Sequence, residues 1–368
     1  MNRLKFTRAE LRELGFDALL AVSGYAERDG NVCYLCGHKN AFPYSNAGNI
    51  ISGLGFSALL VPTESQNPTI LVAPLGYQSD VVTGVDQAKT GTNLADELVA
   101  AIKESGLESA KIALAGSDII PVAYLDKVKS TCPSLKIDYQ DGLVSNQRMI
   151  KSENELRLIR FASKIADKAL GLTIDSVKPG MTESEIGTIA RRTAMELGAD
   201  YVVRDRVQSG PEIGRLRWPF ASKRKVKKGE LVSIDFVGWV NSYGFDILRF
   251  ACAGRPNKEQ KRVVEGAAQA TASMSDALRD GTTVESCMIS LKEIERQGFH
   301  VSPFGHAIGL EIVESPYLLP GGSGDVKKNM VFCVEPDVKL GKYSASIENE
   351  IVVTDGKPEI LTKLSEDI

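Results

Sequence analysis

The stretch Leu231-Val232-Ser233-Ile234-Asp235-Phe236 places one acidic residue inside an apolar run, and this combination decides the fold. The run predicts a buried β-strand, in which a carboxylate needs a partner because burying an isolated charge is costly. Asp246 follows beyond the turn-forming residues Asn241-Ser242-Tyr243-Gly244, so the two acids belong to one predicted hairpin. A hairpin turning about Val240-Asn241 would place Asp235 directly opposite Asp246, with Cβ atoms about 5 Å apart. Two carboxylates at that separation repel unless a cation lies between them, so the hairpin predicts a metal site.

A second pair of acids arises in the same way farther along the chain. Residues 331–353 predict another hairpin, which turns about Gly341-Lys342 and would place Glu335 opposite Glu348. Four carboxylates around one cavity form a ligand set for two hard or borderline divalent ions. His306 completes the set, because it lies between two nearby glycines that allow close backbone approach. A single pair would be explained better as solvated hairpin residues, but two pairs in matching places favour the metal site.

The two hairpins belong to a repeated pattern of elements. Each hairpin follows two predicted helices, and the helices begin after capping residues, which are Ser152, Thr182, Asn257 and Thr283. The fourth helix is expected to run without interruption to Gly298. Asp235 and Glu335 are 100 residues apart, so the acids occupy corresponding places in the two halves. Element order and spacing therefore predict a pseudo-twofold domain made of duplicated helix-helix-hairpin units.

Residues 1–150 predict a separate α/β domain, because helical and strand-like patterns alternate there. The predicted elements are a helix near Arg8–Leu14, strands at Ala18–Val22, Leu59–Val61 and Ile70–Val72, a helix over Ala95–Ser105 and a strand at Lys111–Leu114. The polar segment Asp141–Lys151 precedes a long helix and is the best candidate for a linker. We therefore predict an α/β (α+β) protein with domains at 1–150 and 151–368.

Length and composition narrow the class of function. The chain has 368 residues, of which 43% are apolar and 25% charged, as in a folded globular protein. A net charge of −3 offers no basic field for a nucleic acid, so we expect a small molecule or a short peptide as partner. No apolar run approaches the roughly 18 residues of a membrane span, and Met1-Asn2-Arg3-Leu4 leads directly into an amphipathic helix instead of the apolar region of a secretory signal. We therefore expect a cytoplasmic protein without membrane contact.

Two local motifs have simpler explanations than binding sites. Cys33-x-x-Cys36-x-His38 has the spacing of half a zinc site, but no second half exists and the apolar, strand-like neighbours favour core packing. The six cysteines are dispersed, mostly among apolar residues, which indicates reduced core thiols rather than disulfides. The basic run at residues 222–228 precedes the strand at Leu231 and is expected to be a solvated loop rather than an RNA site.

The chain resembles the pita-bread metallopeptidases, the family of Xaa-Pro aminopeptidase, prolidase and methionine aminopeptidase, with creatinase as a relative. The motifs that carry the resemblance are Asp235 and Asp246 with Tyr243 and Arg249 nearby, Gly305-His306-Ala307-Ile308-Gly309-Leu310, Glu335-Pro336 and Ile347-Glu348-Asn349. The resemblance implies a creatinase-like N-terminal α/β domain over residues 1–150, a C-terminal pita-bread catalytic domain over 151–368, and a homodimer. It also implies that a dinuclear centre is bound by Asp235, Asp246, His306, Glu335 and Glu348.

The implied activity is hydrolysis of a C–N bond by water shared between two metal ions. Glu335 and His306 form the catalytic set, in which Glu335 passes a proton from water to the leaving nitrogen. Carboxylates and one imidazole accept manganese, cobalt, zinc or iron, so the ligands leave the identity of the metal open. The conservative expectation is an Xaa-Pro peptidase that cleaves a dipeptide or short peptide.

Three positions depart from the family motifs. Arg217 and Val313 stand where family peptidases carry histidines, and Ser346 replaces an arginine before the last metal glutamate. We expect an altered substrate pocket, in which Arg217 either holds a substrate anion or lies at the surface, and Val313 offers apolar surface. Tyr243 and His300 are further expected substrate contacts. A specialised hydrolase of a non-peptide amide or amidino compound, like creatinase, is the alternative. A metal-free binding module is disfavoured because all five ligands are present.

Overall fold

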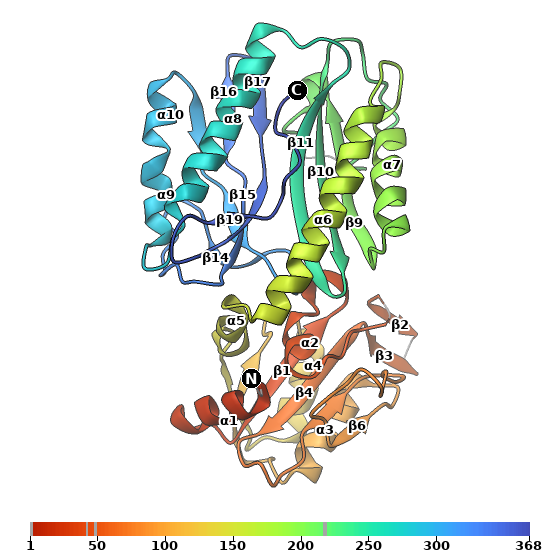
Figure 1. The fold of residues 1–368 in the computed structure, drawn as a ribbon. Coiled ribbons are helices and arrows are strands. Elements are labelled where there is room, and N and C mark those ends of the chain that lie inside the picture. The colour runs from red at the N-terminus through yellow and green to blue at the C-terminus, as the bar shows by residue number, and fades with distance from the viewer. Residues whose placement is uncertain (1–2, 42, 48–49, 216–218) are drawn as a thin grey trace. The chain divides into compact units, whose positions relative to one another are not determined.

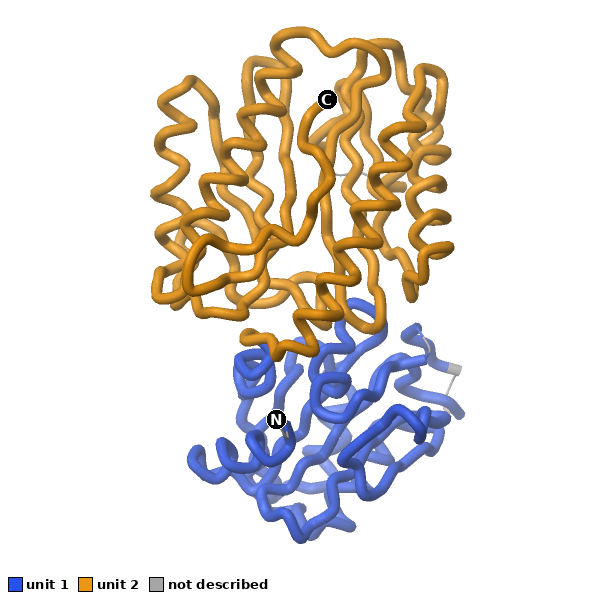
Figure 2. Tube along the Cα trace, in the orientation of Figure 1, with its two compact units in different colours: residues 1–148 blue, residues 149–368 orange. Residues whose placement is uncertain are grey.

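The computed structural model describes residues 3–41, 43–47, 50–215 and 219–368. It divides into two compact units, residues 1–148 and 149–368, which are drawn in blue and orange in Figure 2. Among the described residues, no helix combines the length and the apolar character that crossing a lipid bilayer would require.

The first unit is built on a six-stranded mixed sheet with the order β6-β5-β4-β1-β7-β8 (Figure 1). The central strand β1 is buried along its whole length, because it pairs antiparallel with β4 and parallel with β7. The bounds of its elements are α1 (Arg3–Glu13), β1 (Ala18–Gly24), a 3-10 turn η1 (Ala26–Arg28), α2 (Gly30–Cys36), β2 (Ser45–Ala47), β3 (Ile51–Leu54), β4 (Phe56–Pro62), β5 (Ile70–Val72), β6 (Gln87–Lys89), α3 (Leu94–Glu104), β7 (Lys111–Ala115), α4 (Val122–Thr131), β8 (Lys136–Tyr139) and α5 (Gly142–Met149).

Most elements predicted for this region are present, with three differences. The first helix begins at Arg3 rather than near Arg8. Cys33 and Cys36 lie on helix α2 rather than on a strand, and both side chains are buried in the unit. The segment that the sequence suggested as a linker is mostly helical, because residues 142–149 form α5.

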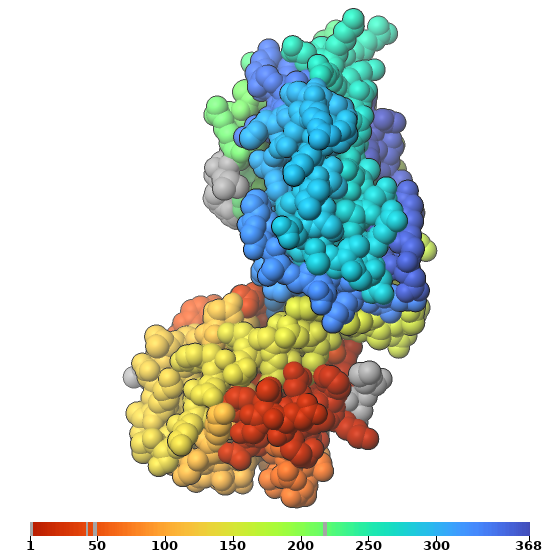
Figure 3. All heavy atoms as spheres, turned by 90° about the vertical axis from the view of Figure 1, so that its left-hand side faces the viewer, coloured from red at the N-terminus to blue at the C-terminus, as the bar shows by residue number. Residues whose placement is uncertain are grey.

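The second unit contains three sheets with the orders β11-β10-β9, β12-β16-β17 and β14-β13-β15-β18-β19. Helices α6 and α7 pack beside the first sheet, while α8, α9 and α10 cover the side of the unit that faces the viewer in Figure 3. The bounds are α6 (Glu153–Ser176), α7 (Glu183–Glu196), β9 (Tyr201–Ser209), a 3-10 turn η2 (Gly210–Glu212), β10 (Leu231–Val240), β11 (Tyr243–Cys252), α8 (Lys258–Ala277), α9 (Val284–Ser290), α10 (Lys292–Arg296), β12 (His300–Ser302), β13 (Gly305–Ala307), β14 (Glu314–Tyr317), β15 (Val331–Val334), β16 (Asp337–Leu340), β17 (Tyr343–Ser346), β18 (Asn349–Val352) and β19 (Glu359–Ile360).

Equivalent hydrogen bonds in the two halves support the predicted duplication. In each half, one backbone hydrogen bond joins the segment before the second helix to the segment before the hairpin. Another joins the segment before the hairpin to the segment after it. The equivalent backbone bonds are Gly180 N to Val226 O and Gly281 N to Val326 O, followed by Gly229 N to Ala253 O and Asn329 N to Val353 O. The members of each pair are about 100 residues apart, so the two halves repeat the same chain path.

The predicted helix starts are also observed. Ser152 and Thr182 each form a capping box with the glutamate three residues later, and Asn257 forms one with Gln260. The predicted continuous helix from Thr283 to Gly298 is wrong, because it is divided at Leu291 into α9 and α10. Ser290 Oγ donates to Cys287 O just before the break, a side-chain bond that competes with regular helix geometry.

The first hairpin has a different register from the predicted one. Val240 pairs with Tyr243, so the turn consists of Asn241 and Ser242, which have φ of 50° and 76°. Two residues with positive φ form the type I′ turn that joins twisted antiparallel strands. The predicted turn centre lies too early, and Asp235 pairs with Leu248 rather than with Asp246. The two acids are diagonal neighbours on one face, still within reach of a common ion.

The second hairpin has the predicted register but an interrupted ladder. The pairing of β15 with β18 has the same register as the pairing of β16 with β17, and this register would place Glu335 opposite Glu348. The two pairs belong to different sheets, and both glutamates lie in the gap between them. Pro336 has no N–H to donate to a ladder, which explains the interruption. Glu335 N instead donates to Phe304 O, and Glu348 N donates to Leu248 O of the first hairpin.

Candidate metal centre

The three-stranded sheet positions the first two acids. Ile234 and Phe236 on β10 are fully buried in the core beneath α6 and α7, so the alternating residue Asp235 projects from the opposite face. Asp246 on β11 projects from the same face, because it pairs with Val237 two residues beyond Asp235. The apolar run therefore anchors the strand while presenting a carboxylate on its other side.

The five predicted ligands converge in one cluster. One oxygen each from Asp235, Asp246 and Glu348 lies within 4.8 Å of the others. His306 Nε2 lies 3.9 Å from Asp246 Oδ2 and 3.5 Å from Glu335 Oε1. All these side chains are buried or nearly so, since the most accessible, that of Glu335, is 15% exposed. The structure thus brings together acids from both hairpins and the imidazole from β13.

Backbone contacts hold the ligands in place. His306 Nδ1 lies 3.0 Å from Ala307 O, which leaves Nε2 facing the carboxylates. The buried Arg249 donates from Nη1 to the carbonyl oxygen of Glu348 and from Nη2 to Asn349 Oδ1 at 2.8 Å. Ser346 Oγ donates to Glu335 O at 3.0 Å. These bonds fix the two glutamates at the gap where the ladder gives them no support.

Burial and mutual repulsion perturb the acids strongly. Burial, with the charges of Asp235 and Glu335, raises the pKa of Asp246 to about 7. Burial and the neighbouring acids raise the pKa of Glu348 well above its usual value. Burial opposes charge on His306, but the hydrogen bond to Glu335 and the nearby carboxylates outweigh it and raise the His306 pKa. Full ionisation of this cluster therefore requires cations.

Unsatisfied oxygen atoms show where such cations would fit. Among the described residues, Asp235 Oδ1, Asp246 Oδ1 and both carboxylate oxygens of Glu348 are buried without a hydrogen-bond partner. Buried polar atoms in a native protein are normally paired, so four orphaned oxygens in one cluster indicate a missing partner. Four carboxylates and one imidazole fit two divalent ions in charge and donor type.

The structure adds residues that the sequence did not single out. Arg206 on β9 forms an ion pair with Asp235, and Arg204 Nη1 lies 3.8 Å from the same carboxylate. Glu350 accepts a hydrogen bond from the backbone N of Asp246 at 2.9 Å and another from Ser163 Oγ. His306 has two further neighbours. The sulfur of Cys333 lies within 4.8 Å of ligand atoms of His306 and Glu348. The ring of Phe304 lies edge-on to the imidazole, with ring centroids 6.2 Å apart. Alternation along β9 is visible in the sequence, but only its pairing with β10 brings the arginines to Asp235.

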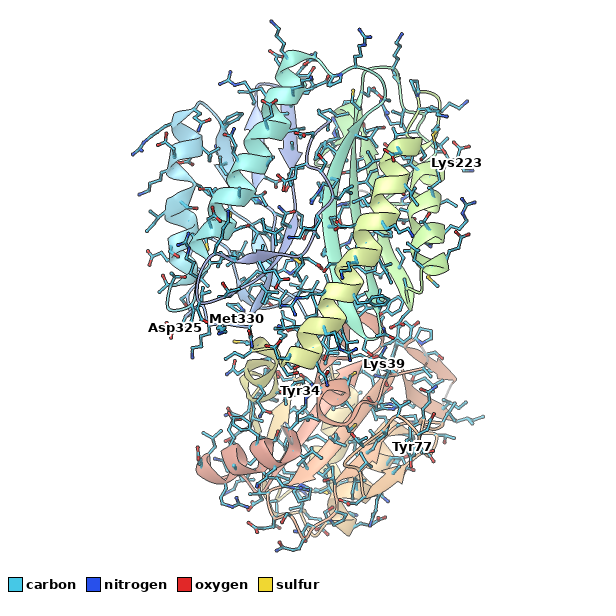
Figure 4. All side chains as sticks on the ribbon, viewed as in Figure 1. Tyr34, Lys39, Tyr77, Lys223, Asp325 and Met330 are labelled. Atoms are coloured by element: carbon cyan, nitrogen blue, oxygen red, sulfur yellow. The ribbon has the colours of Figure 1, made fainter. Side chains whose placement is uncertain are left out.

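The expected substrate contacts have different environments. Tyr243 is buried, and its hydroxyl donates to Glu155 Oε1 at 3.1 Å. Val313 is 48% exposed, and His300 is exposed on β12. Arg217 lies outside the described residues. The lysines of the basic run are exposed, with Lys223 pointing outward in Figure 4, but Arg224 is only 20% exposed and forms an ion pair with Glu230.

Comparison with known proteins agrees with this site. Residues 157–355 match metallopeptidase family M24, and residues 3–150 match the creatinase/prolidase N-terminal domain. The Xaa-Pro dipeptidase of Pyrococcus furiosus is 27% identical over 62% of this chain and 67% of its own. That of Pyrococcus horikoshii is 26% identical over 73% and 75%. The X-Pro aminopeptidase structure from Thermotoga maritima is 26% identical and superposes with a TM-score of 0.83, covering 100% of this chain and 99% of the other.

The chain belongs to metallopeptidase family M24. Within that family it has the two-part organisation with a creatinase/prolidase N-terminal domain. The predicted resemblance and fold class are therefore confirmed. The names of these relatives agree with the peptidase interpretation rather than with the alternative of a non-peptide amide hydrolase.

Proposed function

We propose that this protein is a dinuclear metal-dependent peptidase that cleaves Xaa-Pro dipeptides or short peptides. The observation that carries the proposal is the cluster of four carboxylates and one imidazole with orphaned buried oxygens. Three relatives named as Xaa-Pro dipeptidases or an X-Pro aminopeptidase support the substrate class. A metal-free binding module would gain nothing from burying so many unpaired acids.

The proposed ligands are Asp235, Asp246, His306, Glu335 and Glu348. Two divalent ions held there would lower the pKa of a bound water and polarise the scissile carbonyl. Manganese, cobalt, zinc and iron all suit this donor set, so availability decides among them. The carboxylates are buried or nearly so, and their attraction for cations is therefore stronger than it would be in bulk water.

Glu335 is the proposed proton shuttle. It is the most accessible of the four acids, and its Oε1 lies 3.5 Å from His306 Nε2. Burial raises the pKa of Glu335, although His306 acts against the rise. A carboxylate with a raised pKa can accept a proton from the attacking water and deliver it to the leaving nitrogen. Arg217, Val313, Tyr243 and His300 are the proposed substrate contacts.

A homodimer in the cytoplasm completes the proposal. The family resemblance of the N-terminal domain supports the dimer. All six cysteines are free thiols and five are buried, as expected in a reducing compartment. Light scattering that gives the 39.8 kDa mass of a monomer would contradict the dimer.

The decisive test combines metal analysis with a substrate panel. Protein purified without chelator is loaded with manganese, cobalt or zinc and assayed with Gly-Pro, Ala-Pro and Leu-Pro, beside a set of small non-peptide amides. We expect close to two ions per chain and cleavage of the dipeptides. Glu335→Gln should abolish turnover, whereas Val313→His should alter the KM values without abolishing it. A metal-loaded protein that cleaves only the amides, or nothing, would overturn the proposal.

A further inference from the structure

Two arginines on β9 lie beside the candidate metal centre and have no part in the chemistry proposed above. Arg204 and Arg206 alternate along the strand, so both side chains project from one face. Arg206 pairs with Asp235, while Arg204 pairs with Val237, which in turn pairs with Asp246. The sheet thus aligns two basic and two acidic side chains in adjacent rows on the same face.

The opposite face of β9 serves a different purpose. Asp205 forms an ion pair with Arg191 of α7 at 2.9 Å, and Val207 is fully buried in the core. The side chains of Arg204 and Arg206 are 32% and 25% exposed, whereas that of Asp235 is 3% exposed. The two arginines therefore lie between the buried carboxylates and solvent, where an entering molecule would meet them.

The two arginines bring two positive charges to the edge of the candidate metal centre. The carboxylates of the four proposed acidic ligands would neutralise two divalent ions without help from any basic side chain. Asp337 adds a negative charge near Arg206, and Lys339 adds a positive charge near Asp337. An excess of positive charge beside a neutral centre attracts an anionic ligand. Guanidinium groups are suited to carboxylates, because they donate paired hydrogen bonds in a fixed geometry.

We propose that Arg204 and Arg206 form an anion-recognition site that selects substrates with a carboxylate close to the scissile bond. The inference rests on the proposed peptidase function and names its substrate class. Two groups in a peptide supply the same chemistry, namely the C-terminal carboxylate of a dipeptide and the side chain of an acidic first residue. Arg206 contacts a metal ligand and Arg204 lies near it, so the recognised carboxylate would lie on the Asp235 side of the centre.

Binding of a small dianion tests the site without any turnover. Manganese-loaded wild type, Arg204→Gln, Arg206→Gln and the control Arg191→Gln are titrated calorimetrically with succinate and with neutral succinamide. We expect succinate to bind about tenfold more weakly to the first two variants than to the wild type and the control. Succinamide should not distinguish the four proteins. Added salt should weaken succinate binding, because the arginines are partly exposed.

A peptide panel identifies which carboxylate is recognised. Glu-Pro is compared with Gln-Pro, and Ala-Pro with Ala-Pro amide, for the same four proteins. A rise in KM confined to Glu-Pro indicates the side chain of the first residue, and a rise shared by all free dipeptides but absent from the amide indicates the C-terminus. Either pattern supports the proposal. An equal loss for charged and neutral ligands, together with reduced manganese content, would show that the arginines only position Asp235 and would overturn it.

The two proposals fail in distinguishable ways. If the wild type cleaves none of the peptides, the peptidase function fails. Weaker succinate binding in Arg204→Gln and Arg206→Gln would then still support the anion site, and unchanged binding would refute it. Arg206→Lys adds a further comparison, since it keeps the charge but loses the paired geometry and should bind succinate with intermediate affinity.

Discussion

The chain buries a histidine among other ionisable side chains in two regions, and the pKa of the histidine shifts in opposite directions in the two. In the first unit, burial raises the pKa of the Cys33 and Cys36 thiols to about 11 and about 12, and lowers that of His38 to about 4. In the second unit, His306 is buried just as deeply, yet its pKa rises because Glu335 and other acids surround it. Burial therefore favours the neutral imidazole of His38, whereas the surrounding acids favour a charged imidazole at His306.

The difference shows that neighbours, rather than motif spacing, decide what a buried histidine does. Cys33, Cys36 and His38 are close in sequence, but burial keeps each of them in its neutral form. The second region collects ligands from strands far apart in sequence, and each member changes the others' charge. Among the described residues, clusters able to hold a metal ion occur only there.

The largest expected effect separates the two regions by metal content. Asp246→Ala should remove at least one ion per chain and lower activity by at least about a hundredfold, because it deletes a buried carboxylate that we propose as a ligand. Cys36→Ala in the first unit should leave both quantities unchanged. Elemental analysis of the two purified variants provides the measurement. Metal loss in Cys36→Ala instead would mean that the first region also binds an ion.

The next effect concerns the support of the charged region. Arg249 is 1% exposed and donates to the carbonyl oxygens of Leu248, Glu348 and Leu364. Arg249→Lys cannot reproduce this fork, so the free energy of unfolding should fall by about 2–4 kcal/mol. Denaturant unfolding, with the exposed Arg262→Lys as control, measures the loss. Equal stability of both variants would show that the glutamate backbone needs no such support.

A smaller effect tests the neutral region through pH. Unfolded His38 protonates below about pH 6.5, whereas folded His38 resists protonation until about pH 4. The unfolded state therefore binds more protons as the pH falls through this window, and stability decreases, by about 2 kcal/mol between pH 7 and pH 5. Hydrogen exchange of the first unit's sheet in the full chain measures this loss. His38→Gln should remove the part of this decrease that His38 causes. An unchanged dependence of stability on pH in the variant would show that His38 is not the group responsible.

Local features made much of this structure predictable. Apolar runs located β1, β5 and β10, and capping residues located the starts of the long helices. The proposed metal ligands could be singled out because each acid lies in a context where a solvated carboxylate is out of place. Tertiary pairing was not predictable in the same way. Arg206 reaches Asp235 only because β9 pairs with β10. The strand ladder is interrupted at Glu335 and Pro336 because the strand pairs on either side belong to different sheets.

The register of the first hairpin could not be predicted from its turn residues. The turn residues suggested a hairpin turning about Val240-Asn241, but Asn241 and Ser242 themselves form the turn and adopt left-handed conformations. Asn and Asp tolerate such φ values better than most residues, and serine has no comparable preference. The sequence pattern therefore could not distinguish turns one residue apart, although either register keeps Asp235 and Asp246 on one face.

The smallest expected effect follows from this turn. Ser242→Gly should raise the free energy of unfolding by about 0.5 kcal/mol, because glycine adopts a φ of 76° without the strain that a Cβ imposes. The backbone N of Ser242, which donates to Asp200 Oδ2 at 2.9 Å, remains available in the variant. Gly341→Ala in the equivalent turn should have the opposite sign, since Gly341 has a φ of 58°. Denaturant unfolding measures both changes, and metal content should stay constant because neither substitution shifts the register. Metal loss in Ser242→Gly would show that the turn, rather than the ladder and the buried contacts, positions the acids.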